Sequence, residues 1–94
     1  MARPKTKSCT LDGAALPDAA AVYRELGQTL GAPSYFGNNP DALWDVITEH
    51  SGEPIEIVWR HSAQSATRLG RYFEDIVAVL RRAEEHGHIK LRIE

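Results

Sequence analysis

The sequence lacks several features that define other classes of protein. It has a single cysteine, Cys9, which excludes a disulfide within the chain and fits a reducing compartment. It has no run of about 18 apolar residues, so no transmembrane helix is expected. The basic segment Met1–Lys7 leads into no apolar stretch, which argues against a secretory signal. These absences predict a cytoplasmic protein with no membrane partner.

Positive charge is also missing from the middle of the chain. No Lys or Arg occurs between Arg24 and Arg60, whereas six of the 13 acidic residues lie there. Such an asymmetry bears on partners rather than on fold. Because phosphate binding needs cations, it argues against direct nucleic-acid binding and favours a basic protein surface or a metal ion. The six acids are Glu25, Asp41, Asp45, Glu49, Glu53 and Glu56.

Length and periodicity predict one small α/β domain over residues 1–94, with residues 1–6 as a flexible extension. No repeat, low-complexity segment or interdomain linker is present. Strand-like and helical segments alternate, and strands joined by helical connections are normally parallel. We therefore expect a three-stranded parallel sheet packed with about four helices. The expected strands are Ser8–Leu11, Pro54–Arg60 and Ile89–Ile93, and the expected helical segments are 17–30, 40–50 and 62–86, the last with a break at Gly70.

The most informative segment runs from Pro33 to Asp45. An aromatic loop in it leads directly into a short helix. Asn39 can cap this helix through its side-chain oxygen, and Pro40 suits the first helical position, where its missing N–H would have no partner. Asp41 falls in the first turn, where the helix dipole favours a negative charge.

Acidic residues recur at intervals of four along this helix, so they share one face. Like charges at that spacing cost a few tenths of a kcal/mol per pair, roughly. We interpret a face that accepts this cost as shaped for a partner, with a merely solvated helix face as the alternative. The acidic residues are Asp41, Asp45 and Glu49, and the buried face is expected to hold Leu43, Val46 and Ile47.

The same segment resembles the signature of the barstar family, which are intracellular protein inhibitors of barnase-type ribonucleases. The matching residues are Tyr35-Phe36-Gly37-x-Asn39-x-Asp41-Ala42-Leu43-Trp44-Asp45. A Leu-Asp-Gly opening, a strand ending in Trp59-Arg60 and an Arg-x-Ala…Gly close of the last helix follow in the same order. The resemblance covers essentially the whole chain as a single barstar-like domain.

The resemblance implies tight, reversible, non-covalent inhibition of a small secreted guanyl-type microbial ribonuclease in a one-to-one complex, with no enzymatic activity and no cofactor. The aromatic loop and the acidic helix would plug the ribonuclease active site. Asp45 would take the place of an RNA phosphate, Asp41 would contact a neighbouring donor, and Tyr35 would stack on a ring near the site. The residues carried over as partner-binding are Tyr35, Asn39, Asp41, Trp44, Asp45 and Thr48, and Glu49 joins them through its spacing.

Three positions depart from the family pattern. His50 stands where relatives carry an additional interface aromatic, and Arg82 and His86 stand at acidic positions late in the last helix. The changes suggest a target ribonuclease with a less basic or differently charged rim. They also keep open an alternative, a barstar-fold binding or regulatory module whose partner is not a nuclease.

Other candidate sites are weaker. The pair His86 and His88 lacks the further convergent ligands that a zinc site needs, so no metal site is expected. Asp41 and Asp45 could act as a catalytic acid–base pair, but no second constellation accompanies them. Cys9 lies in a predicted strand and is expected to be a buried small hydrophobe rather than a nucleophile. Trp44 is expected either to face the core and position the helix or to contact the partner.

Overall fold

The computed structural model describes residues 8–32, 37–49 and 54–94. It contains one parallel sheet in the order β1-β2-β3, formed by Ser8–Asp12 (β1), Ile55–Arg60 (β2) and Ile89–Ile93 (β3). The helices in these residues are Ala19–Leu30 (α1), Pro40–Glu49 (α2), Ser62–Leu69 (α3) and Arg71–Glu85 (α4). The predicted α/β fold with a three-stranded parallel sheet is confirmed, and so is the break at Gly70.

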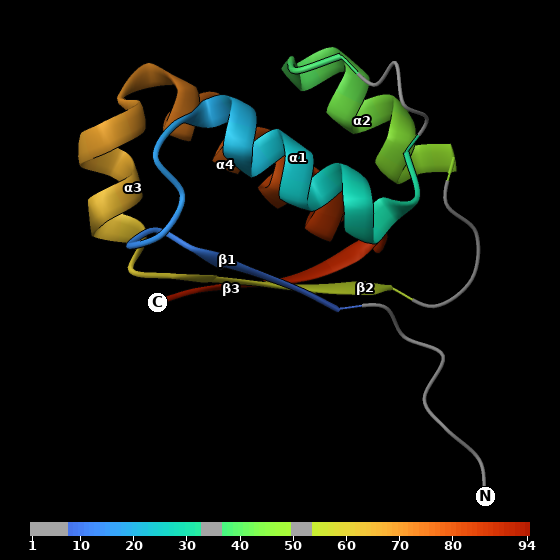
Figure 1. Cartoon of the computed structure of the whole chain (residues 1–94). Coiled ribbons are helices and arrows are strands. Elements are labelled where there is room, and N and C mark those ends of the chain that lie inside the picture. The colour runs from blue at the N-terminus through green and yellow to red at the C-terminus, as the bar shows by residue number, and fades with distance from the viewer. Residues whose placement is uncertain (1–7, 33–36, 50–53) are drawn as a thin grey trace, which may run out of the picture.

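The helices all lie on one side of the sheet and leave its other face open (Figure 1). Burial alternates along the central strand in agreement with this arrangement. Ile55, Ile57 and Trp59 of β2 are buried, whereas Glu56 and Arg60 are exposed. Since successive side chains of a strand point to opposite faces, one face of the sheet belongs to the core and the other meets solvent.

The first helix has clear start and stop signals. The Asp18 carboxylate accepts a hydrogen bond from the N–H of Ala21 at 2.9 Å and caps the N-terminus. Gly31 ends the helix in the left-handed conformation with φ 70°, and its N–H donates to the carbonyl of Gln28. α1 therefore runs over nearly the range that the sequence predicts.

A turn after β1 joins distant parts of the backbone. The N–H of Gly13 donates to the carbonyl of Arg60 at 2.8 Å, and a Cβ at Gly13 would collide with the carbonyl oxygen of His61. The Arg68 side chain donates to the carbonyls of Gly13 and Ala14, each at 3.1 Å. Only glycine fits this position, and α3 is tied to the turn through Arg68.

The core fills the space between the sheet and the helices. Trp59 is fully buried, and its indole N–H donates to Ser65 Oγ at 2.8 Å. The ring of Phe73 meets Trp59 edge-on, with ring centroids 5.0 Å apart. Ser65 is itself buried, so the pair satisfies two polar groups that would otherwise lack partners. Leu43 and Ile47 belong to the same core, which anchors α2 to the rest of the fold.

Candidate functional site

α2 begins with a side-chain cap. Asn39 Oδ1 accepts a hydrogen bond from the N–H of Ala42 at 2.8 Å, and the Asn39 carbonyl accepts one from the N–H of Leu43 at 3.1 Å. Pro40 is the first helical residue and Asp41 lies in the first turn. The capping role predicted for Asn39 is confirmed, and it fixes the direction in which the helix starts.

The two sides of α2 have opposite environments. Leu43 and Ile47 are fully buried, and the helix packs against α4 and α1. Val46 packs against the core but is only half-buried, because it lies at the edge of the apolar stripe rather than at its centre. The other side carries the exposed carboxylates, which are those of Asp41, Asp45 and Glu49.

Thr48 supports the helix from within. Its hydroxyl lies 2.9 Å from the carbonyl oxygen of Trp44 and 3.1 Å from that of Asp45, to which it donates. Its proton is therefore used inside α2, while the hydroxyl oxygen keeps acceptor capacity. Thr48 is half-buried, on the flank of the helix between its core and its acidic side.

Trp44 faces the C-terminal end of α4. The guanidinium carbon of Arg82 lies 4.3 Å from the centroid of the indole ring, a cation–π contact. The His86 ring meets the same indole edge-on, with centroids 5.6 Å apart and an interplanar angle of 71°. Trp44 is half-buried, and both partners are exposed. The indole thus joins the acidic helix to a cationic part of α4.

His88, the residue before β3, completes this group. Its ring centroid lies 6.1 Å from that of Trp44 and 6.4 Å from that of His86. The backbone fixes its place, because the N–H of His88 donates to the carbonyl of Ala83 at 2.9 Å. Among the described residues, no group of three or more His, Cys, Asp or Glu side chains could hold a metal ion.

The sequence indicates parts of this arrangement but not their contact. Arg82 and His86 are departures from the family pattern, and His86 and His88 are a weak metal candidate. The contact with Trp44 was not predicted. The four-residue spacing of Arg82 and His86, which puts them on one flank of α4, was the available signal.

Some predicted site residues lie outside the described residues. These are Tyr35 in the aromatic loop and His50 after α2. The stacking role of Tyr35 and the departure at His50 stay predictions.

Comparisons with known proteins show which family the chain belongs to. Residues 6–93 match the family model described as Barstar (barnase inhibitor). The chain belongs to the barstar family. It is also 33% identical over 75 residues to a Bacillus subtilis (strain 168) protein named "Putative ribonuclease inhibitor YrdF", a match that spans 80% of this chain and 82% of that protein. The resemblance inferred from residues 35–45 is confirmed.

Membership of the barstar family gives the function at the family level, which is inhibition of barnase-type ribonucleases. Proteins of this family are inhibitors rather than enzymes. In the described part of this barstar-family chain, no helix has the length and apolar character needed to cross a membrane.

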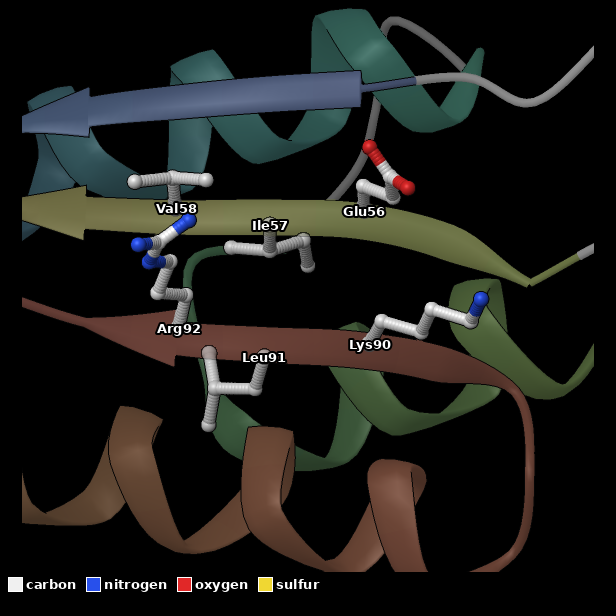
Figure 2. Close-up of a pocket in the computed structure, with 6 residues that line it drawn as sticks. All are labelled: Glu56, Ile57, Val58, Lys90, Leu91 and Arg92. Atoms are coloured by element: carbon white, nitrogen blue, oxygen red, sulfur yellow. The ribbon is translucent and has the colours of Figure 1, made fainter. Parts of the chain in front are cut away.

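A second surface lies on the open face of the sheet, away from α2. A shallow hollow of about 190 Å³ lies between β2 and β3. The side chains of Glu56, Val58, Lys90 and Arg92 stand on this face (Figure 2). Arg92 Nε pairs with Glu94 at 2.9 Å. The hollow is flanked by solvated charges and brings no catalytic group together.

Cys9 belongs to the core. It is 4% exposed, and its sulfur lies 4.0 Å from the carbonyl oxygen of Glu25. Burial raises the pKa of the Cys9 thiol above its ordinary value, and the nearby Glu25 charge adds to that rise against a hydrogen bond with Thr29. Burial confirms the expectation of a small hydrophobe, and the raised pKa makes the reactive thiolate scarce.

Proposed function

We propose that the chain inhibits a small secreted guanyl-type microbial ribonuclease by placing the exposed side of α2 in its active site. The observation that carries the proposal is the row of exposed carboxylates on a helix capped by Asn39 and anchored by Leu43 and Ile47. The family description supports a barnase-type target. The name of the Bacillus subtilis relative supports a ribonuclease as the target.

The physical basis is imitation of RNA. A ribonuclease holds RNA phosphates with cationic groups, and a carboxylate in the same place can accept charge-assisted hydrogen bonds from them. Asp45, exposed in the second turn of α2, takes the phosphate position in this proposal, and Asp41 contacts a neighbouring donor one turn earlier. A helix that is already rigid loses little conformational freedom when it binds.

The remaining residues support this contact. Tyr35 stacks on a ring beside the ribonuclease site and helps to exclude water. Thr48 offers its hydroxyl oxygen, since its proton is donated within α2. Glu49 extends the acidic row at the end of the helix, where it adds to the attraction of a basic cleft. Trp44 both positions α2 and borders the contact surface.

The protein performs no catalysis and needs no cofactor in this proposal. It acts in the cytoplasm and protects the producing cell from its own ribonuclease before secretion. The single buried cysteine is compatible with that reducing compartment.

Titration of a panel of small microbial guanyl-type ribonucleases, barnase among them, tests the proposal. We expect RNA cleavage by at least one of them to vanish near a one-to-one ratio of inhibitor to enzyme. Failure to inhibit every ribonuclease in the panel would contradict it.

A partner that is not a nuclease is the second candidate, and one observation favours it. Arg82 places a cation beside the acidic row, where a uniformly basic target would be repelled. Affinity capture with the purified chain, followed by identification of the bound protein, separates the two candidates. A captured ribonuclease supports the first, and a captured protein without ribonuclease activity supports the second.

A further inference from the structure

The group formed by Arg82, His86 and His88 around the indole of Trp44 is here named the cationic rim. The guanidinium carbon of Arg82 lies 4.3 Å from the centroid of the Trp44 indole. The ring centroids of His86 and His88 lie 5.6 and 6.1 Å from the same centroid. The rim joins residues that are far apart in the sequence and come from α2, α4 and the segment before β3. It is a tertiary feature of the fold rather than a local run of charge.

The cationic rim lies beside the acidic row. Each residue of a helix is turned by about 100° from the previous one, so Trp44 occupies the flank of α2 next to the side that carries Asp41 and Asp45. Arg82 of α4 and His86, the residue that follows the helix, both contact Trp44 of α2. Arg81 is turned by about 100° from Arg82 around the helix axis and so points away from this contact. A partner that covers the carboxylates of α2 therefore also reaches Arg82.

Arg82 forms no ion pair within the described part of the chain. The ion pairs found there both use Glu94, which pairs with Arg60 and Arg92. Arg82 is exposed, and its guanidinium lies over the indole face, so its position is largely set before a partner arrives. A pre-positioned cation loses little side-chain entropy on binding, and it repels any cation placed opposite it.

We infer that Arg82, held by Trp44, is a specificity-determining residue that selects a ribonuclease carrying a carboxylate on the rim of its active site. The inference rests on the proposed function and narrows the class of target. The partner has a cationic centre that receives Asp45 and an acidic side chain at the edge that pairs with Arg82. The rings of His86 and His88 pack against the same indole, with centroids 5.6 and 6.1 Å from its centroid.

Charge reversal at Arg82 tests this inference on the ribonucleases of the panel that the chain inhibits. The variants are Arg82→Glu, Arg82→Met, which keeps an apolar stem without charge, and Arg81→Glu as the matched control. Arg81 is exposed on the same helix, and its reversal changes the net charge by the same amount. Dissociation constants come from inhibition of RNA cleavage, and thermal unfolding verifies that each variant is folded.

For the target that the chain inhibits most strongly, we expect Arg82→Glu to raise the dissociation constant at least about tenfold, and Arg82→Met to raise it about threefold. The control Arg81→Glu should change it less than about twofold, because an exposed charge away from the contact contributes little. Replacing the facing carboxylate of the ribonuclease by Lys should restore binding of the Arg82→Glu variant.

Three outcomes distinguish failure of this inference from failure of the proposed function. Loss of affinity with Arg82→Glu and recovery on the charge swap support the inference. Inhibition that is unchanged or strengthened by Arg82→Glu overturns the inference and leaves the proposed function standing. Absence of inhibition by every form of the chain, on every ribonuclease, overturns the proposed function instead.

Discussion

Asp45 and Trp44 are neighbours in the sequence but have different surroundings. Asp45 is exposed on the acidic side of α2, whereas Trp44 is half-buried and contacts Arg82 and His86. The difference follows from the rotation of about 100° between successive helical residues. Asp45 is therefore available to a partner without any rearrangement of the fold, and Trp44 sets the edge of the surface around it.

Replacement of Asp45 by Ala should weaken the ribonuclease complex strongly. Truncating one partner of a buried charge pair leaves the other without compensation, at a cost of about 2–5 kcal/mol. Measurements on the barnase–barstar complex are part of that general range. A loss of about 2 kcal/mol corresponds to a dissociation constant raised about 30-fold. Inhibition assays with the purified variant measure the change.

Glu56→Ala is the matched control for this substitution. Glu56 is exposed on the open face of the sheet, away from α2, and its loss removes the same charge (Figure 2). Affinity should stay within about threefold of the wild type, as expected for an exposed charge outside the contact. Equal effects of the two substitutions would contradict the role given to Asp45.

At the scale of elements, α2 depends on its cap and on two apolar anchors. The Asn39 side chain satisfies the N–H of Ala42, and Leu43 and Ile47 insert into the core. The cap defines where the helix starts and the anchors define which side faces outward. Because Leu43 and Ile47 face the core, the acidic row on the other side of α2 faces solvent.

Asn39→Ala should destabilise the fold by about 1 kcal/mol, because an N–H at the start of α2 loses its partner. Urea unfolding followed by the fluorescence of Trp44 and Trp59 measures the change in the free energy of unfolding. Asn38→Ala is the control, since Asn38 is exposed and precedes the capping residue. We expect Asn39→Ala to lower the free energy of unfolding and Asn38→Ala to leave it nearly unchanged. Equal losses for the two variants would contradict the capping role of Asn39.

Much of the element pattern could be predicted because its signals are local. Asp18 before α1, Gly31 after it, and the pair Asn39 and Pro40 before α2 mark helix ends by chemistry that acts within a turn. The alternation along residues 89–93 likewise indicates an edge strand, and β3 occupies an edge of the sheet. These signals involve residues that are close in the sequence, so they do not depend on how the rest of the chain packs.

The cationic rim could not be predicted, because it depends on how helices pack. Trp44 is separated by about 40 residues from Arg82 and His86, and only the packing of α2 on α4 brings them together. Which flank of a helix is covered is decided by its neighbours, and a single sequence does not contain their placement.

At the scale of the whole molecule, one side of α2 carries three exposed carboxylates, those of Asp41, Asp45 and Glu49. The net charge is only −2, but α2 and its flanking segments contribute no Lys or Arg between residues 24 and 60. Such an acidic surface attracts a basic cleft over distances comparable with the Debye length, about 10 Å at 0.1 M salt. The effect is on the rate of encounter more than on the lifetime of the complex.

The association rate constant with an inhibited ribonuclease should therefore fall as salt rises. Stopped-flow mixing at several ionic strengths measures it, and we expect a drop of at least about tenfold between 10 and 500 mM salt. The dissociation rate should change much less. An association rate independent of salt would contradict steering by the acidic surface.

The buried thiol and phenol make the fold sensitive to alkali. Burial raises the pKa of Cys9 and of Tyr23, and the nearby charge of Asp75 adds to the rise at Tyr23. The unfolded chain then releases these protons at lower pH than the folded chain does. Their contribution to stability is complete below the ordinary pKa of the thiol and is lost as pH rises through the folded-state values.

Urea unfolding between pH 7 and pH 11 checks this expectation. The free energy of unfolding should be level up to about pH 8 and should decrease above it. Cys9→Ala should flatten the first part of that decrease, since it removes the thiol while keeping a small apolar side chain in β1. A stability that rises with pH in this range would contradict the assigned direction.

A crystal structure of the chain bound to a ribonuclease that it inhibits tests the central claim most directly. The quantity to measure is the distance from the Asp45 carboxylate to the cationic side chains that bind RNA phosphate in the free enzyme. The account predicts a hydrogen-bonded contact of about 2.7–3.2 Å, with α2 inside the active-site cleft. An Asp45 carboxylate that faces solvent in such a complex would contradict it.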